Sequence, residues 1–203
     1  MTSGDNQVSS AHFATFIYPI MVEKCPSGGL NYPYPLFVNN TVSINQYVLL
    51  IDCDLRRPHL HKILGQSNHI GLHEYLAGRG RLSDLLLKTR FEKLALLTAG
   101  SAAPNPSELL SSTKMRQFLE EVKDRYEDRF IILDAPPCHI TSETSVLSNY
   151  VDGVIFVVMA QKSPRAAIQK SIQDFRNKTI GIVFNGYNPS YRSYGKYYKK
   201  YYK

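Results

Sequence analysis

The stretch Tyr47-Val48-Leu49-Leu50-Ile51-Asp52 decides the fold of this chain. It is a continuous apolar run that ends in a carboxylate, which is typical of a strand buried on both faces of a parallel sheet. Four more runs of this kind follow along the chain, at residues 94–98, 130–133, 153–158 and 179–184. The sequence therefore predicts a sheet of at least five strands.

Helical patterns separate these runs. The spacing i, i+3, i+4, i+7 after a predicted N-cap at Thr113 indicates an amphipathic helix with Met115, Phe118, Leu119 and Val122 on its buried face. Two more helix starts carry a proline in the first turn, at Asn105-Pro106 and at Ser163-Pro164. Strands that alternate with helices predict an α/β fold, with an open, mostly parallel sheet flanked by helices over residues 46–186.

The two ends of the chain differ from this middle part. Residues 1–45 hold four prolines and few charges, and we expect a poorly ordered segment without helical or strand periodicity. Residues 187–203 contain seven of the 14 tyrosines and five basic side chains but no acid, which predicts a flexible tail. Five of the seven net positive charges of the chain thus lie at the carboxyl terminus.

Composition excludes several classes of protein. With 43% hydrophobic and 20% charged residues, the 203-residue chain can bury a core, so it is neither wholly disordered nor a coiled-coil rod. No apolar run is long enough to span a membrane, and the apolar residues 13–22 lack a basic start, so we expect a cytoplasmic location. The three cysteines lack metal-ligand spacing and are expected to be buried apolar residues.

Polar residues follow the predicted strands at the edge where ligands bind in open parallel sheets. Asp52 and Asp54 follow the first run, Asp134 follows another, and Asn185 follows the last. Because Mg²⁺ is held by one or two carboxylates plus substrate phosphates, three carboxylates can serve a metal–nucleotide and leave one to accept a proton. Alternatively, each aspartate merely caps the helix that follows it.

Together these motifs resemble those of bacterial tyrosine autokinases that regulate exopolysaccharide chain length and export. Residues 48–58 (VLLIDCDLRRP) are similar to the family's second Walker A motif, and residues 131–137 (IILDAPP) to its Walker B motif. The resemblance covers residues 46–203 and is closest to the branch of the family that is encoded at exosortase-associated loci. Further matching segments are GLHEYL (71–76), LTAGSAAPNPSELL (97–110), residues 125–130, VDGV (151–154) and the tyrosine cluster. It implies a P-loop NTPase-like fold related to ParA and MinD.

The resemblance also implies ATP and Mg²⁺ as cofactors and assigns roles to residues. Asp52 and Asp134 would hold Mg²⁺, and Asp54 would accept the proton of the incoming tyrosine. Arg56 would neutralise phosphate charge or support subunit contacts, and Asn185 would face the adenine. The autophosphorylation sites would lie in the tail, at Tyr187, Tyr191, Tyr194, Tyr197, Tyr198, Tyr201 and Tyr202.

The family further implies partners: a membrane-anchored polysaccharide co-polymerase that recruits the domain to the inner face of the membrane, further copies of the chain, and a tyrosine phosphatase. No nucleic acid is expected. Taken alone, however, the basic and aromatic tail also fits binding to nucleic acid or to an acidic polymer.

The sequence departs from the family at the first Walker A motif. No GK[ST] occurs in the chain; Gly28 and Gly29 resemble the front of a phosphate loop without its lysine and hydroxyl. Three interpretations remain: a tyrosine autokinase with impaired catalysis, a non-catalytic phospho-acceptor or regulatory subunit, and a ParA/MinD-type ATPase. The tyrosine tail argues against the third, and the abrupt break in resemblance between Gly29 and Tyr47 favours a frameshift in the gene.

Overall fold

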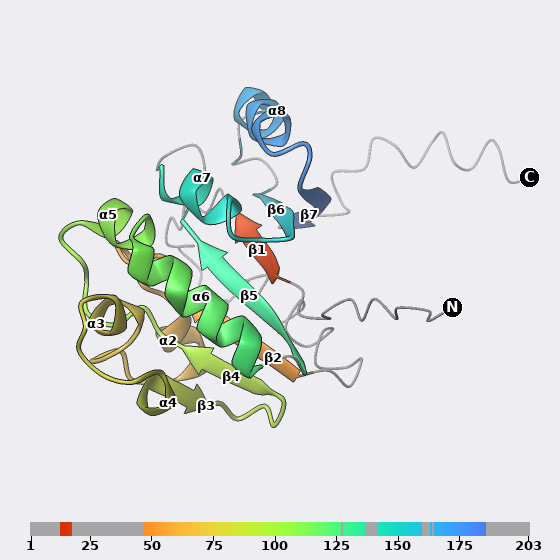
Figure 1. The fold of residues 1–203 in the computed structure, drawn as a ribbon. Helices are drawn as coiled ribbons and strands as arrows, with labels where there is room; N and C mark the ends of the chain where they lie inside the picture. The colour runs from red at the N-terminus through yellow and green to blue at the C-terminus, as the bar shows by residue number, and fades with distance from the viewer. Residues whose placement is uncertain are drawn as a thin grey trace, which may run out of the picture.

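A seven-stranded sheet organises the part of the chain that the structure describes (Figure 1). The structure is a computed structural model that describes residues 13–17, 47–126, 128–136, 142–159, 163 and 165–185. The strands are β1 (Phe13–Ile17), β2 (Tyr47–Asp52), β3 (Leu86–Lys88), β4 (Leu94–Leu97), β5 (Arg129–Ala135), β6 (Gly153–Met159) and β7 (Thr179–Asn185). Their spatial order is β3-β4-β2-β5-β1-β6-β7, and every pair is parallel except β3 with β4.

Helices cover both faces of this sheet. They are α2 (Leu60–Leu64), α3 (Leu72–Leu76), α4 (Leu82–Leu85), α5 (Pro106–Leu110), α6 (Thr113–Arg125), α7 (Glu143–Ser148) and α8 (Arg165–Asp174). Helices α3 to α7 contribute buried residues to one core, on the face that α6 crosses in Figure 1. On the opposite face, Leu60 of α2 packs in a second core with side chains of β2, β4, β5 and β6.

Most sequence predictions for the middle of the chain are confirmed. All five predicted strands are present, and the predicted face of α6 is buried at Met115, Phe118, Leu119 and Val122. The N-cap of α6 is not Thr113 but Ser112, whose Oγ accepts a hydrogen bond from the Met115 N–H at 3.1 Å. Cys53 is buried, as expected; Cys25 and Cys138 lie outside the described residues.

The prediction that residues 1–45 lack a strand is wrong at β1. This strand lies in the middle of the sheet, between β5 and β6, with Phe13 opposite Ile131 and Ala14 opposite Gly153. A strand with neighbours on both sides depends on partners more than a hundred residues away, and its short sequence carries no local period to reveal it. The short antiparallel strand β3 was also missed, because its three residues are too few to show an alternating pattern.

The register of β2 and β5 sets up the site. These strands are direct neighbours, and Asp52 lies opposite Asp134 at their carboxyl ends.

Among the described helices, none combines the length and the apolar character needed to cross a bilayer.

Candidate functional site

Two buried carboxylates lie side by side at the carboxyl edge of the sheet. Asp52 ends β2 and is fully buried, and Asp134 near the end of β5 is only 5% exposed. The backbone ties the two strand ends together, because the N–H of Cys53 donates to the Asp134 carbonyl at 2.8 Å. The structure thus brings together two of the residues that the sequence assigned to Mg²⁺.

The Asp52 side chain also organises the loop that follows it. One carboxylate oxygen accepts the N–H of Asp54 at 3.2 Å, and the other accepts those of His59 (3.3 Å) and Leu60 (3.2 Å). Leu60 begins α2, so Asp52 satisfies N–H groups at the start of that helix. The alternative that an aspartate here caps the next helix is therefore confirmed for Asp52.

The Asp52 carboxylate has a second property besides capping, which is a raised pKa. Burial, reinforced by the charge of Asp54, raises the pKa of Asp52 to about 7 despite the hydrogen bonds from Leu60, Asp54 and His59. A nearby cation would stabilise the ionised form of a carboxylate that burial makes costly to ionise. Two adjacent carboxylates also match the way in which proteins hold Mg²⁺. No group of three His, Cys, Asp or Glu side chains that could hold a metal ion occurs among the described residues.

Asp54 and Arg56 lie on the same loop but make different contacts. Asp54 is partly buried, and its Oδ1 accepts the Arg57 N–H at 3.0 Å. The Arg56 Nε–H donates to one oxygen of Glu143 at 2.8 Å, and Nη2 forms an ion pair with the same oxygen, also at 2.8 Å. The Ser107 hydroxyl donates to the same oxygen, also at 2.8 Å.

Glu143 is the site residue that sequence reasoning missed. It is the first residue of α7, and its side chain is only 1% exposed. In the sequence it is one acid in Ser142-Glu143-Thr144, a context without any recognised catalytic pattern. Only the fold brings it to Arg56, 87 residues earlier in the chain.

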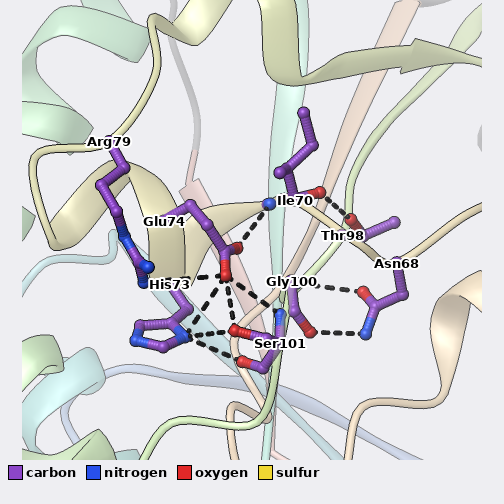
Figure 2. Close-up of polar contacts among 9 residues, drawn as sticks. Asn68, Ile70, His73, Glu74, Arg79, Thr98, Gly100 and Ser101 are labelled. Carbon is purple, nitrogen blue, oxygen red and sulfur yellow. Dashed lines mark hydrogen bonds and ion pairs between the residues drawn. The ribbon is translucent and has the colours of Figure 1, made fainter.

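Another buried carboxylate, that of Glu74, fixes the neighbouring loops (Figure 2). Glu74 of α3 accepts the Gly71 N–H at 2.9 Å and the Ser101 hydroxyl at 2.5 Å. Burial acts to raise the pKa of Glu74, but the hydrogen bonds from Ser101 and Gly71 outweigh it and hold the pKa below its ordinary value. Asn68 adds two hydrogen bonds with the backbone of Gly100.

This network positions the loop at the edge of the candidate site. The loop that follows β4 runs through Ser101, and its Ala103 N–H donates to the Leu55 carbonyl at 3.1 Å, one residue after Asp54. The segments that carried the resemblance at 71–76 and 97–110 are therefore joined to each other and to the aspartate loop.

The remaining predicted site residues are not brought to this point. Asn185 is the last residue of β7, which is separated from β5 by β1 and β6. Gly28 and Gly29 lie outside the described residues, as do all seven tail tyrosines, so their proposed roles stay predictions.

Comparison with known proteins agrees with this geometry. The putative tyrosine-protein kinase CapB of Staphylococcus aureus is 33% identical over 140 residues, 68% of this chain and 60% of the relative. Tyrosine-protein kinase YwqD of Bacillus subtilis is 32% identical over 154 residues, 74% of this chain and 64% of the relative. The chain belongs to the bacterial tyrosine-protein kinase family. No protein-family model matches the sequence.

Solved structures of tyrosine-kinase domains share the fold. The VpsO kinase domain superposes with a TM-score of 0.73 at 29% identity, covering 89% of this chain and 87% of that domain. The kinase domain of Escherichia coli ETK gives a TM-score of 0.74 at 28% identity, covering 89% and 69%. The MinD protein of Pyrococcus horikoshii, at 20% identity and a TM-score of 0.60, shares the fold alone, which confirms the predicted P-loop NTPase-like class.

The tyrosine-kinase resemblance is thus confirmed, and the ParA/MinD alternative is not better supported. The chain spans 19% to 64% of the length of the first curated relatives it matches. The exosortase-associated branch stays a prediction.

Proposed function

We propose that this domain transfers the γ-phosphoryl group of ATP to tyrosine hydroxyls, as the kinase part of a regulator of exopolysaccharide chain length and export. The observation that carries this proposal is the pairing of Asp52 with Asp134 at the carboxyl edge of the sheet, in a tyrosine-kinase family fold. The pairing supports the proposal because ligands of open parallel sheets bind at the carboxyl ends of the strands.

In this proposal each acid has its own task. Asp52 and Asp134 hold Mg²⁺, which neutralises charge on the transferring phosphoryl group when bound. Asp54 accepts the proton of the tyrosine hydroxyl, whose ordinary pKa is about 10, as a bond forms from that oxygen to the γ-phosphorus and ADP leaves. Asp54 suits this task because its side chain is only partly buried and it follows the metal-holding Asp52 by two residues.

The substrate and partners follow from the same proposal. The acceptors are the seven tail tyrosines, which basic residues accompany, so that added phosphates find charge partners. Asn185 faces the adenine, and further copies of the chain assemble around the site. A membrane-anchored co-polymerase activates the domain at the inner membrane face, and a tyrosine phosphatase reverses the reaction.

A second candidate function is that of a phospho-acceptor subunit. The specific observation in its favour is the absence of GK[ST] from the sequence. Without the loop lysine the β- and γ-phosphates lose a cationic partner, and without the Ser/Thr hydroxyl Mg²⁺ loses a ligand. Such a chain would receive phosphate from a complete kinase.

One experiment separates the two functions. The purified chain is incubated with Mg-ATP, alone or with the kinase domain of Escherichia coli ETK, and phosphate is located by mass spectrometry. Phosphate within residues 187–202 in the chain alone supports the kinase, provided that Asp134→Asn abolishes it. Phosphate there only after ETK is added supports the acceptor. Phosphate confined to Tyr75 or Tyr126 contradicts both.

A further inference from the structure

The junction around Glu143 connects the three segments that frame the candidate site. Glu143 receives hydrogen bonds from Arg56 on the loop after β2 and from Ser107 on α5. Its neighbour Thr144 donates to the carbonyl of Pro136, just beyond the end of β5, at 2.6 Å. The start of α7 is therefore tied to the strand end that carries Asp134 and to the loop that carries Asp54.

The exposure of the two charges is unequal. The Glu143 side chain is 1% exposed, whereas half of the Arg56 side chain, 51%, is in contact with solvent. The contacts with Glu143 are the Nε–H hydrogen bond and the Nη2 ion pair of a guanidinium that has five donors in a rigid plane. Glu143 thus fixes one edge of that plane, and the guanidinium remains accessible from outside.

Stability alone is a weak reason to bury this carboxylate. Removing a carboxylate from water costs several kcal/mol, and apolar side chains often replace a buried ion pair without loss of stability. Fixed donors that face an anion bind it better than a mobile side chain, because less conformational freedom is lost on binding. The geometry fits a device that orients Arg56.

We propose that Glu143 is a positioning residue that holds the Arg56 guanidinium at the carboxyl edge of the sheet, ready to bind the phosphates of the nucleotide. The inference rests on the proposed function, because it takes the anion at this edge to be a nucleotide phosphate. Ser107 assists by fixing the same Glu143 oxygen. Glu143 itself does not touch the nucleotide.

The sign of the effect distinguishes positioning from other roles. Glu143→Gln removes a negative charge, so electrostatics alone would leave anion binding unchanged or make it tighter. Loss of the charge-assisted hydrogen bonds that orient Arg56 would make binding weaker. A purely structural role would lower thermal stability without changing the affinity of the folded protein for an anion.

The test is a calorimetric titration of the full chain with magnesium pyrophosphate, with the Arg56 Nε–H resonance also followed by NMR in the variants that keep Arg56. We expect Glu143→Gln to weaken binding at least about tenfold, which corresponds to one lost charge-assisted hydrogen bond. Arg56→Ala should weaken it as much, and the double variant no further. Asp84→Asn is the matched control, because it removes an exposed carboxylate paired with Arg81 at 3.0 Å on α4 and should change nothing.

Each remaining outcome counts against the inference alone or against both the inference and the proposed function. Pyrophosphate binding that Arg56→Ala weakens but Glu143→Gln leaves unchanged or tighter overturns the inference and leaves the proposed function intact. No binding by the unmodified chain removes the phosphate site, and with it both. If Glu143→Gln does not fold, Glu143→Asp keeps the charge but withdraws it from Arg56, and it should weaken binding in the same direction; unchanged binding would overturn the inference.

Discussion

Gly71→Ala is expected to destabilise the domain much more than Gly65→Ala, because Gly71 sits where two loops touch. The backbone of Gly71 is extended (φ −174°), a conformation that any residue adopts, so the cost of a methyl group here is steric. A Cβ at Gly71 would overlap the carbonyl oxygen of Thr98 and the nitrogen of Gly100. Both are backbone atoms, which cannot rotate away as the end of a flexible side chain could.

The magnitude follows from the contacts at this point. Overpacking costs about 1–3 kcal/mol. Separating the loops also strains the hydrogen bonds from Leu72 N–H to the Thr98 carbonyl (2.8 Å) and from Gly71 N–H to Glu74 (2.9 Å), each contributing about 1 kcal/mol. The total is ~3–5 kcal/mol, a large part of the 5–15 kcal/mol typical of a domain.

Gly65 is the matched control. Its φ is +63° and a Cβ there would meet nothing within 4 Å, so alanine costs only the left-handed backbone conformation, about 1–2 kcal/mol. Urea denaturation followed by circular dichroism measures the free energy of unfolding of both variants. If Gly71→Ala lost no more stability than Gly65→Ala, the two loops would not be clamped as Figure 2 shows, and the reasoning would be refuted.

Four further predictions concern binding, catalysis, pH dependence and stability. The chain should bind Mg-ATP only weakly, because GK[ST] is missing, and a micromolar dissociation constant from calorimetry would contradict this. Restoring a phosphate loop between residues 28 and 44 should return autokinase activity. In that restored chain, Asp54→Asn should lower the activity roughly 100- to 10,000-fold on a phosphotyrosine blot. An unchanged rate would show that Asp54 is not the base. The pKa of Asp52 rises from 3.8 to about 7 on folding, so its protonation stabilises the fold fully below pH ~4, and this stabilisation disappears as the pH rises through 7. One unit of pKa shift corresponds to 1.36 kcal/mol, so without Mg²⁺ the free energy of unfolding of the unmodified chain, measured relative to that of Asp52→Asn, should fall by up to ~4 kcal/mol between pH ~4 and pH 7. A difference between the two proteins that stays the same at every pH would contradict the pKa shift. Lys178→Met should cost ~2 kcal/mol in thermal denaturation, because the ammonium donates to the carbonyls of Ser148 (2.6 Å) and Val151 (2.9 Å); exposed Lys170→Met should cost little, and equal losses would exclude this explanation.

The candidate site could be predicted in part, because strand ends carry their own signal. Asp52 and Asp134 each follow an apolar run, and parallel strands bring their carboxyl ends to one edge. The sequence could not show that Asp52 also caps α2, because that contact depends on how the loop closes over seven or eight residues. It could not reveal Glu143 either, because an acid at a helix start is ordinary until its partner is known.

By itself, the sequence determined the elements whose signal is local: the buried strand β2, the periodic face of α6 and the carboxylates at the strand ends. Hydrophobic period and capping act within a few residues, so they can be read without knowledge of the fold. Only the tertiary structure decided the insertion of β1 between β5 and β6, the pairing of Arg56 with Glu143, and the contact of Glu74 with Ser101. Each of these depends on the order of strands in the sheet, which brings together residues that are 27 or more positions apart and that no local pattern connects.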